Sequence, residues 1–160
     1  MAEEKTYTVE QAHYFFALEF HTKTWELLEK AERSKAEDTH MLDFAHASLA
    51  HWRSIGTATR HKRGEWLVSR VYAVLGNGAE ALKHAILSYE VFERNKNEMD
   101  DFDGAFVYEA IARAYAVSGQ KTEALKFIGL AKKSAESIRE KDDRDVFLAE
   151  FNSGEWYGVK

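Results

Sequence analysis

The sequence predicts an all-α fold built from antiparallel helix hairpins, and three observations support this prediction. The chain has 160 residues and no proline. Alanine, leucine, glutamate, lysine and arginine, which favour helices, are abundant, whereas alternating β-branched residues are nearly absent. A stretch of thirteen residues also occurs twice, as YAVLGNGAEALKH from Tyr72 and as YAVSGQKTEALKF from Tyr115. Internal repetition of this kind is typical of helical repeat proteins.

The first hairpin is predicted over residues 9–55. Both of its helices follow a hydroxyl residue that stands three positions before a carboxamide or carboxylate residue. These pairs are Thr8 with Gln11 and Ser34 with Glu37, and each has the sequence of a capping box. Apolar side chains then recur every three or four positions, as expected for helices with one buried face.

Two further hairpins are predicted over residues 61–94 and 102–139. The two copies of the repeated stretch stand where one helix ends and the next begins. Gly76 and Gly119 provide the turns, because glycine adopts the left-handed conformation that ends many helices. We expect a single domain over residues 1–160, because each hairpin buries its apolar face only against the next one. Seven helices are predicted, the last of them a cap on the stack, over residues 9–32, 37–55, 61–75, 77–94, 102–118, 121–139 and 143–152.

The repeated hairpins resemble the tetratricopeptide repeat, a family with small residues and a Tyr on the first helix, a Gly at the turn and small residues on the second helix. The two copies match these positions at Ser69, Tyr72, Gly76, Ala81 and Ser88, and at Ala112, Tyr115, Gly119, Ala124 and Ala131. The resemblance covers about half of the chain, and the copies are 43 residues apart, whereas about 34 is usual for the family. It implies a right-handed superhelical stack of antiparallel hairpins, a solenoid whose first helices line a concave groove that binds a protein or peptide.

The resemblance also implies which side chains face the groove. Arg70 and Arg113 stand at the same place in the two copies, and Trp66 and Glu109 stand four residues before them. Together with Tyr108, they would bind an acidic or C-terminal segment of a partner, since a guanidinium pairs with a carboxylate through two hydrogen bonds. The alternative is a local role, in which Glu109 pairs with Arg113 one turn away and Arg70 stacks on Trp66.

A basic cluster of Arg60, His61, Lys62 and Arg63 precedes and begins the third predicted helix. The helix dipole is positive there, so cations are unfavourable unless a negative group faces them. A bound anion would meet this need, and so would a crossing acidic helix. The cluster is therefore a candidate anion site, with a solvated basic turn as the alternative.

The seven histidines of the chain indicate a second class of function. A Glu-x-x-His and an Asp-x-x-His spacing, which end at His13 and His46, place a carboxylate and an imidazole on one helical face. This is a spacing of metal ligands in helical bundles. A metal-binding or small-ligand-binding protein, with or without enzymatic activity, would use His13, His46, His51 and Glu65. The alternative is that these side chains hydrogen-bond in a polar seam between helices.

The composition argues against several partners. The formal net charge is −5, so neither nucleic acid nor an anionic membrane surface is expected to bind. The chain has no cysteine and no motif for nucleophilic catalysis, so we expect a binding module rather than an enzyme, and no cofactor. No apolar run is long enough to span a bilayer, and the expected location is the cytoplasm. A third candidate function is self-assembly as a structural homo-oligomer through the end helices.

Overall fold

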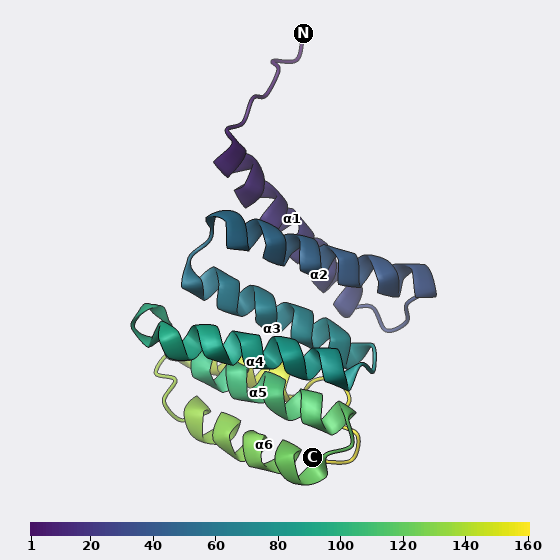
Figure 1. Cartoon of the computed structure of the whole chain (residues 1–160), viewed down its shortest axis with the longest axis vertical. Helices are drawn as coiled ribbons and strands as arrows, with labels where there is room; N and C mark the ends of the chain where they lie inside the picture. The colour runs from purple at the N-terminus through teal and green to yellow at the C-terminus, as the bar shows by residue number, and fades with distance from the viewer.

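The computed structural model describes all residues from 1 to 160, and it contains seven α-helices and no strand (Figure 1). The predicted all-α fold of stacked helix hairpins is confirmed. The helices are α1 (Val9–Leu28), α2 (Lys35–Ile55), α3 (Ala58–Val74), α4 (Gly78–Arg94), α5 (Asp103–Val117), α6 (Lys121–Ala135) and α7 (Lys141–Asn152). A short 3₁₀ turn, Lys96–Glu98, lies between α4 and α5.

The three hairpins stack along the molecule. Helix α1 packs on α2, α3 on α4 and α5 on α6, while α2 against α3 and α4 against α5 join consecutive hairpins. Helix α7 contacts α5, and in Figure 1 it lies behind α4 and α5. Side chains of α1, α3, α5 and α7 line the same hollows. These four helices therefore share one face of the molecule, called the inner face below.

Side-chain caps begin the first two helices where the sequence predicts them. The hydroxyl of Thr8 accepts a hydrogen bond from the backbone N–H of Gln11 at 3.1 Å, and the Gln11 side chain accepts one from the backbone of Thr8 at 2.9 Å. Ser34 and Glu37 form the same reciprocal pair. The glycines at the two repeat turns have φ angles of 80° and 73°. Local sequence signals therefore set the hairpin corners.

Two helices end four residues earlier than predicted. Helix α1 ends at Leu28, because the side chain of Arg33 turns back and donates a hydrogen bond to the carbonyl of Leu27 at 3.2 Å. Helix α6 ends at Ala135, because Ile138 leaves the helical path to enter the core, where only 1% of its surface is exposed. In both cases a side chain from just beyond the helix makes the contact at its end, a local hydrogen bond for α1 and burial in the core for α6, and this outweighs helix propensity.

Small residues allow the helices of each hairpin to approach closely. Ala81 and Ala124 have no exposed surface, in agreement with their expected place at helix crossings. Ser69 donates a hydrogen bond from its hydroxyl to the carbonyl of Ala81 at 2.7 Å, and Ser88 donates one to the carbonyl of Lys62 at 2.9 Å. One bond is donated by α3 to α4 and the other by α4 to α3. A larger residue at either serine would therefore push the two helices apart.

Candidate binding cleft

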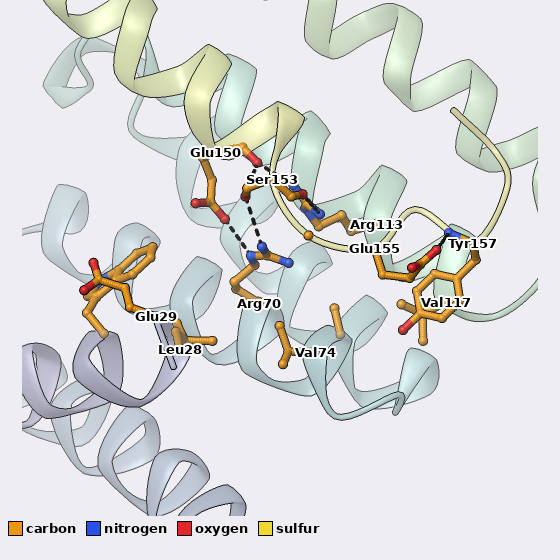
Figure 2. Close-up of a pocket in the computed structure, with 13 residues that line it drawn as sticks. Leu28, Glu29, Arg70, Val74, Arg113, Val117, Glu150, Ser153, Glu155 and Tyr157 are labelled. Atoms are coloured by element: carbon orange, nitrogen blue, oxygen red, sulfur yellow. Dashed lines mark hydrogen bonds and ion pairs between the residues drawn. The ribbon is translucent and has the colours of Figure 1, made fainter. Parts of the chain in front are cut away.

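Helix α7 and the residues after it lie on the inner face, where two arginines hold them (Figure 2). Arg70 of α3 donates from Nε to Oε1 of Glu150 at 2.6 Å and from Nη2 to the hydroxyl of Ser153 at 3.4 Å. Arg113 of α5 donates to the carbonyls of Ser153 and Glu150 at 3.0 and 2.6 Å. Both carbonyls belong to the C-terminal end of α7, where the helix dipole favours a cation. The two arginines thus bind an acidic, C-terminal segment of this chain itself.

Glu109 and Trp66 lie beneath Arg113. The carboxylate of Glu109 is fully buried, pairs with Arg113 and accepts a hydrogen bond from Nε1 of Trp66 at 3.0 Å. The local pairing of Glu109 with Arg113, which the sequence left open, is therefore present. The partner of Arg70 is Glu150, and the ring of Trp66 packs on other aromatic side chains instead.

Tyr108 lies away from this group. The centre of its ring is 6.2 Å from that of Tyr89 and 6.4 Å from that of Phe127, between α4 and α6. Residue 108 is one position before Glu109, which is about 100° around a helix. Since Glu109 points to the inner face, the side chain of Tyr108 points into the seam between hairpins. The structure therefore does not bring Tyr108 to the site that was expected to include it.

Two hollows are open on the inner face between α1 and α7. The first has a volume of about 550 Å³, is called the aromatic hollow and is lined by residues that include Trp25, Trp66, Phe102, Phe106, Val146 and Ala149. The second has a volume of about 410 Å³, is called the charged hollow and is lined by residues that include Glu29, Arg70, Arg113, Glu150, Glu155 and Tyr157 (Figure 2). Trp25 and Glu150 line both hollows, so the two are direct neighbours, and together they are called the cleft below.

Packed rings form the floor of the aromatic hollow. The ring of Trp25 lies 6.0 Å from that of Trp66 and is nearly parallel to it, and Phe106 meets Trp66 edge-on at 5.5 Å. Phe147 of α7 meets Phe106 edge-on at 5.2 Å. These arrangements are favourable for aromatic pairs and fix the rings in place. The hollow therefore offers a rigid apolar surface to a bulky side chain.

The basic cluster lies inside α3, which begins at Ala58. Lys62 donates to Oδ1 of Asp103 at 3.0 Å, and Arg63 donates to both carboxylate oxygens of Asp103 and to Asp100 at 2.8–3.1 Å. Burial lowers the pKa of Lys62. Burial alone would raise the pKa of Asp103, but the two cations beside it hold that pKa below its ordinary value. The acidic start of α5 therefore provides the negative charge beside the basic cluster. This is the crossing acidic helix that the sequence analysis gave as one of two possible sources of that charge.

The other two residues of the basic cluster also have partners inside the chain. The guanidinium of Arg60 lies 4.7 Å from the centre of the Trp52 ring, and Nε2 of His61 lies 3.3 Å from the carboxylate of Glu65. All four members are therefore stabilised by neighbouring side chains, and their placement is explained without a bound anion.

The structure does not bring the four candidate metal ligands together. His13 and His51 are neighbours, with Nδ1 atoms 2.8 Å apart, whereas His46 hydrogen-bonds through Nε2 with the hydroxyl of Tyr72 at 3.1 Å. Glu65 is buried and pairs with a histidine of α4. No cluster of three or more His, Cys, Asp or Glu side chains could hold a metal ion. The histidines lie instead in seams between helices, which is the alternative that the sequence left open.

Sequence reasoning missed Trp25 and Glu150 as site residues. The spacing of Trp25 in the sequence indicates only that it lies on the apolar face predicted for the first helix. A signal for Glu150 existed, because Phe147 and Phe151 are four residues apart and give α7 an apolar face that must be buried. Glu150 stands beside that face. Nothing in the local sequence indicated that this face would pack beside Arg70.

The chain was compared with known proteins. No protein-family model, no curated protein sequence and no solved structure matches it. None of its helices combines the length and the apolar character that crossing a bilayer requires. The assignment of the cleft therefore depends on the geometry of the inner face.

Proposed function

We propose that the protein is a binding module of the tetratricopeptide-repeat type, which holds a peptide segment of a partner protein in the cleft between α1 and α7. The aromatic hollow is the observation that carries this proposal, because it is an open, rigid, mainly apolar cavity of about 550 Å³. The repeated hairpins, their glycine turns and the small residues at the helix crossings support the assignment to this repeat type.

The inner face already accommodates one helix. Helix α7 buries Phe147 and Phe151 against it, with 1% and 3% of their surfaces exposed, and places Glu150 on Arg70. Recognition of an amphipathic helix in a groove uses the same elements, namely apolar anchors four residues apart and a charged contact at one end. A partner segment would lie beside α7 and cover the part of the inner face that α7 leaves open.

The open cleft is a better site for a partner than the arginine pair. An acidic or C-terminal partner segment bound by Arg70 and Arg113 would have to displace the carboxylate and carbonyl groups of α7. A segment in the cleft displaces no protein group. The proposal therefore keeps the peptide-binding function expected from the sequence and moves its site to the cleft.

A library of short random peptides tests this function. Selected peptides are labelled, and their affinity is measured by fluorescence anisotropy for the wild type, for Trp25→Ala and for Leu125→Ala. Trp25 is half-buried and lines both hollows. Leu125 is a matched apolar control, 47% exposed on α6 and outside the cleft. We expect Trp25→Ala to weaken binding about tenfold or more, which corresponds to about 1.4 kcal/mol, and Leu125→Ala to leave it unchanged.

Thermal unfolding of each variant accompanies the binding measurement, because Trp25 also packs on Trp66. The comparison is valid when the Trp25 variant is folded at the assay temperature. A library without any binder, or binders that are indifferent to Trp25→Ala, would contradict the proposal.

Self-association through α1 is a second candidate function, and one observation favours it. Apolar side chains are exposed on α1 and just before it, namely Tyr7, Val9, Tyr14, Phe15, Phe16 and Leu18. Exposed apolar patches of this kind mark interaction surfaces. Sedimentation velocity over a range of protein concentrations tests it. A dimer that Phe15→Lys disrupts would support this function, and a monomer at every concentration would eliminate it.

A further inference from the structure

Intramolecular partners already neutralise the cations of the charged hollow. Arg70 pairs with Glu150, and the two side chains are only 10% and 16% exposed. Arg113 is buried, pairs with Glu109 and donates to two carbonyls at the end of α7. Its guanidinium also lies 4.3 Å from the centre of the Trp156 ring. An incoming carboxylate would have to compete with all of these contacts.

Two carboxylates at the edge of the charged hollow are not neutralised. Glu29 and Glu155 line the hollow, are exposed to solvent and belong to no ion pair of the molecule. Glu29 stands at the C-terminal end of α1, where the helix dipole adds further negative potential. Glu155 accepts one hydrogen bond, from the backbone N–H of Tyr157 at 2.8 Å, and this contact leaves its charge uncompensated.

The charged hollow therefore favours a cation. Three carboxylates line it against two guanidiniums, and one of these guanidiniums also neutralises Glu109. The ring of Tyr157 lines the same hollow and is 46% exposed, so it can contact a cation through its face. The net charge of −5 would attract a basic segment over a longer range.

The aromatic hollow favours a different side chain. Its ion-pairing side chains already have partners, since Lys62 and Arg63 both contact Asp103, and Glu150 contacts Arg70 of the charged hollow. What remains open is the exposed part of the rings that line it, to which the half-buried Trp25 contributes, with Trp66 packed against it. Burying a large apolar side chain there removes apolar surface from water on both partners.

On the basis of the proposed function, we infer that the partner segment is both basic and apolar. It places a Lys or Arg side chain at the edge of the charged hollow, where Glu29 and Glu155 provide unpaired negative charge, and a bulky apolar side chain in the aromatic hollow. Because Trp25 and Glu150 line both hollows, one short segment can fill them together. The partner is thus opposite in charge to the acidic segment that the arginine pair holds within the chain.

A peptide array tests this inference. Each peptide carries a Trp in a background of Gly, Ser and Ala, with a Lys, a Glu or a Ser at every spacing within about two helical turns of the Trp. Affinities of the best members are measured by fluorescence anisotropy at low and high salt. We expect Lys–Trp peptides to bind about tenfold more tightly than the matching Glu–Trp peptides, and the difference to shrink at high salt.

Two double variants, matched in net charge, test whether Glu29 and Glu155 cause the preference for Lys. Glu29→Gln combined with Glu155→Gln is expected to abolish the preference for Lys and to leave the binding of the Ser–Trp peptides unchanged. Glu26→Gln combined with Glu136→Gln makes the same change in net charge at exposed positions outside the cleft, and is expected to keep the preference.

The outcomes separate this inference from the proposed function. If Glu–Trp peptides bind as tightly as Lys–Trp peptides, the basic chemistry of the partner is refuted, while the binding function stands. Glu–Trp peptides that bind and release α7 would refute it as well, because they would be mimics of α7 on the arginine pair. If no peptide of the array or of the random library binds, the proposed function itself fails.

Discussion

The Nε atom of Arg70 lies 2.6 Å from Oε1 of Glu150, although the two residues are 80 positions apart in the chain. This pair joins α3 to α7 and holds one side of the cleft in place. Both side chains are largely shielded from solvent. An ion pair in such a place is screened less by salt than one on the surface, so its loss should be measurable.

Replacement of Glu150 by Gln should lower the free energy of unfolding by about 1–3 kcal/mol, because it leaves the Arg70 guanidinium without its counter-charge. Urea unfolding measures this change, and hydrogen exchange in α7 shows where it acts. Asp145→Asn is the control, since it breaks an exposed pair with Lys141 on the same helix, for which about 0.5 kcal/mol is expected. Equal effects of the two substitutions would show that the Arg70 pair does not hold α7.

Replacement of Arg113 by Met should destabilise the fold by about 3–5 kcal/mol, because Glu109 would remain as an unpaired charge in the interior. Adding Glu109→Gln to this variant should recover a large part of the loss, since a neutral amide still accepts the hydrogen bond from Trp66. Thermal and urea unfolding of the two single variants and the double variant provide the comparison. No recovery in the double variant would mean that Arg113 acts mainly through α7.

The stability of the protein should fall as the pH falls below about 6.5, the ordinary pKa of histidine. Burial lowers the pKa of His21, His46 and His51, so the unfolded chain binds protons more readily than the folded chain does. Stability is therefore complete above that ordinary pKa and declines between it and the lowered pKa of the folded state. Melting temperatures at several pH values between about 7.5 and about 5.5 measure the decline.

The variant His46→Gln tests the origin of this decline. It removes one of the three imidazoles whose pKa burial lowers, so its melting temperature should depend less steeply on pH than that of the wild type. His40→Gln is the control, because His40 is exposed on the same helix. A wild type whose stability does not change over this pH range would contradict the burial of these imidazoles.

Gly154 should not tolerate alanine. Its φ is 71°, and a Cβ atom added there would lie 2.9 Å from a terminal nitrogen of Arg70. Gly154→Ala is expected to cost about 1–2 kcal/mol through backbone strain and displacement of the arginine. Gly129→Ala is the opposite control, because Gly129 lies within α6 and its Cβ would meet nothing, so about 0.5–1 kcal/mol of stabilisation is expected. Urea unfolding shows whether each substitution lowers or raises the free energy of unfolding.

The sequence was a good guide wherever structure depends on near neighbours. Thr8 and Gln11 are three residues apart, and Gly76 turns the chain between two helices that follow each other directly. All the residues that form such a cap or turn are only a few positions apart in the sequence, so the hairpins and their corners could be predicted. The ends of α1 and α6 could not, because side chains beyond each helix decide where it stops.

The cleft was less predictable because its residues come from distant helices. Arg70 and Arg113 stand out in the sequence, but their partners lie on α7, which carries no copy of the repeat. The basic cluster shows the same limit. A need for negative charge near Lys62 could be deduced from the helix dipole, whereas the source of that charge, Asp103, is 41 residues away and became evident only from the fold.

The position of α7 also has a consequence for the order of folding. Every hairpin forms from contacts between residues close in sequence, which is fast, whereas the Arg70–Glu150 pair requires closure of a loop of 80 residues. We therefore expect the three hairpins to assemble first and α7 to dock last. The cleft would then be the latest part of the molecule to form, and thermal fluctuation would open it before any hairpin melts.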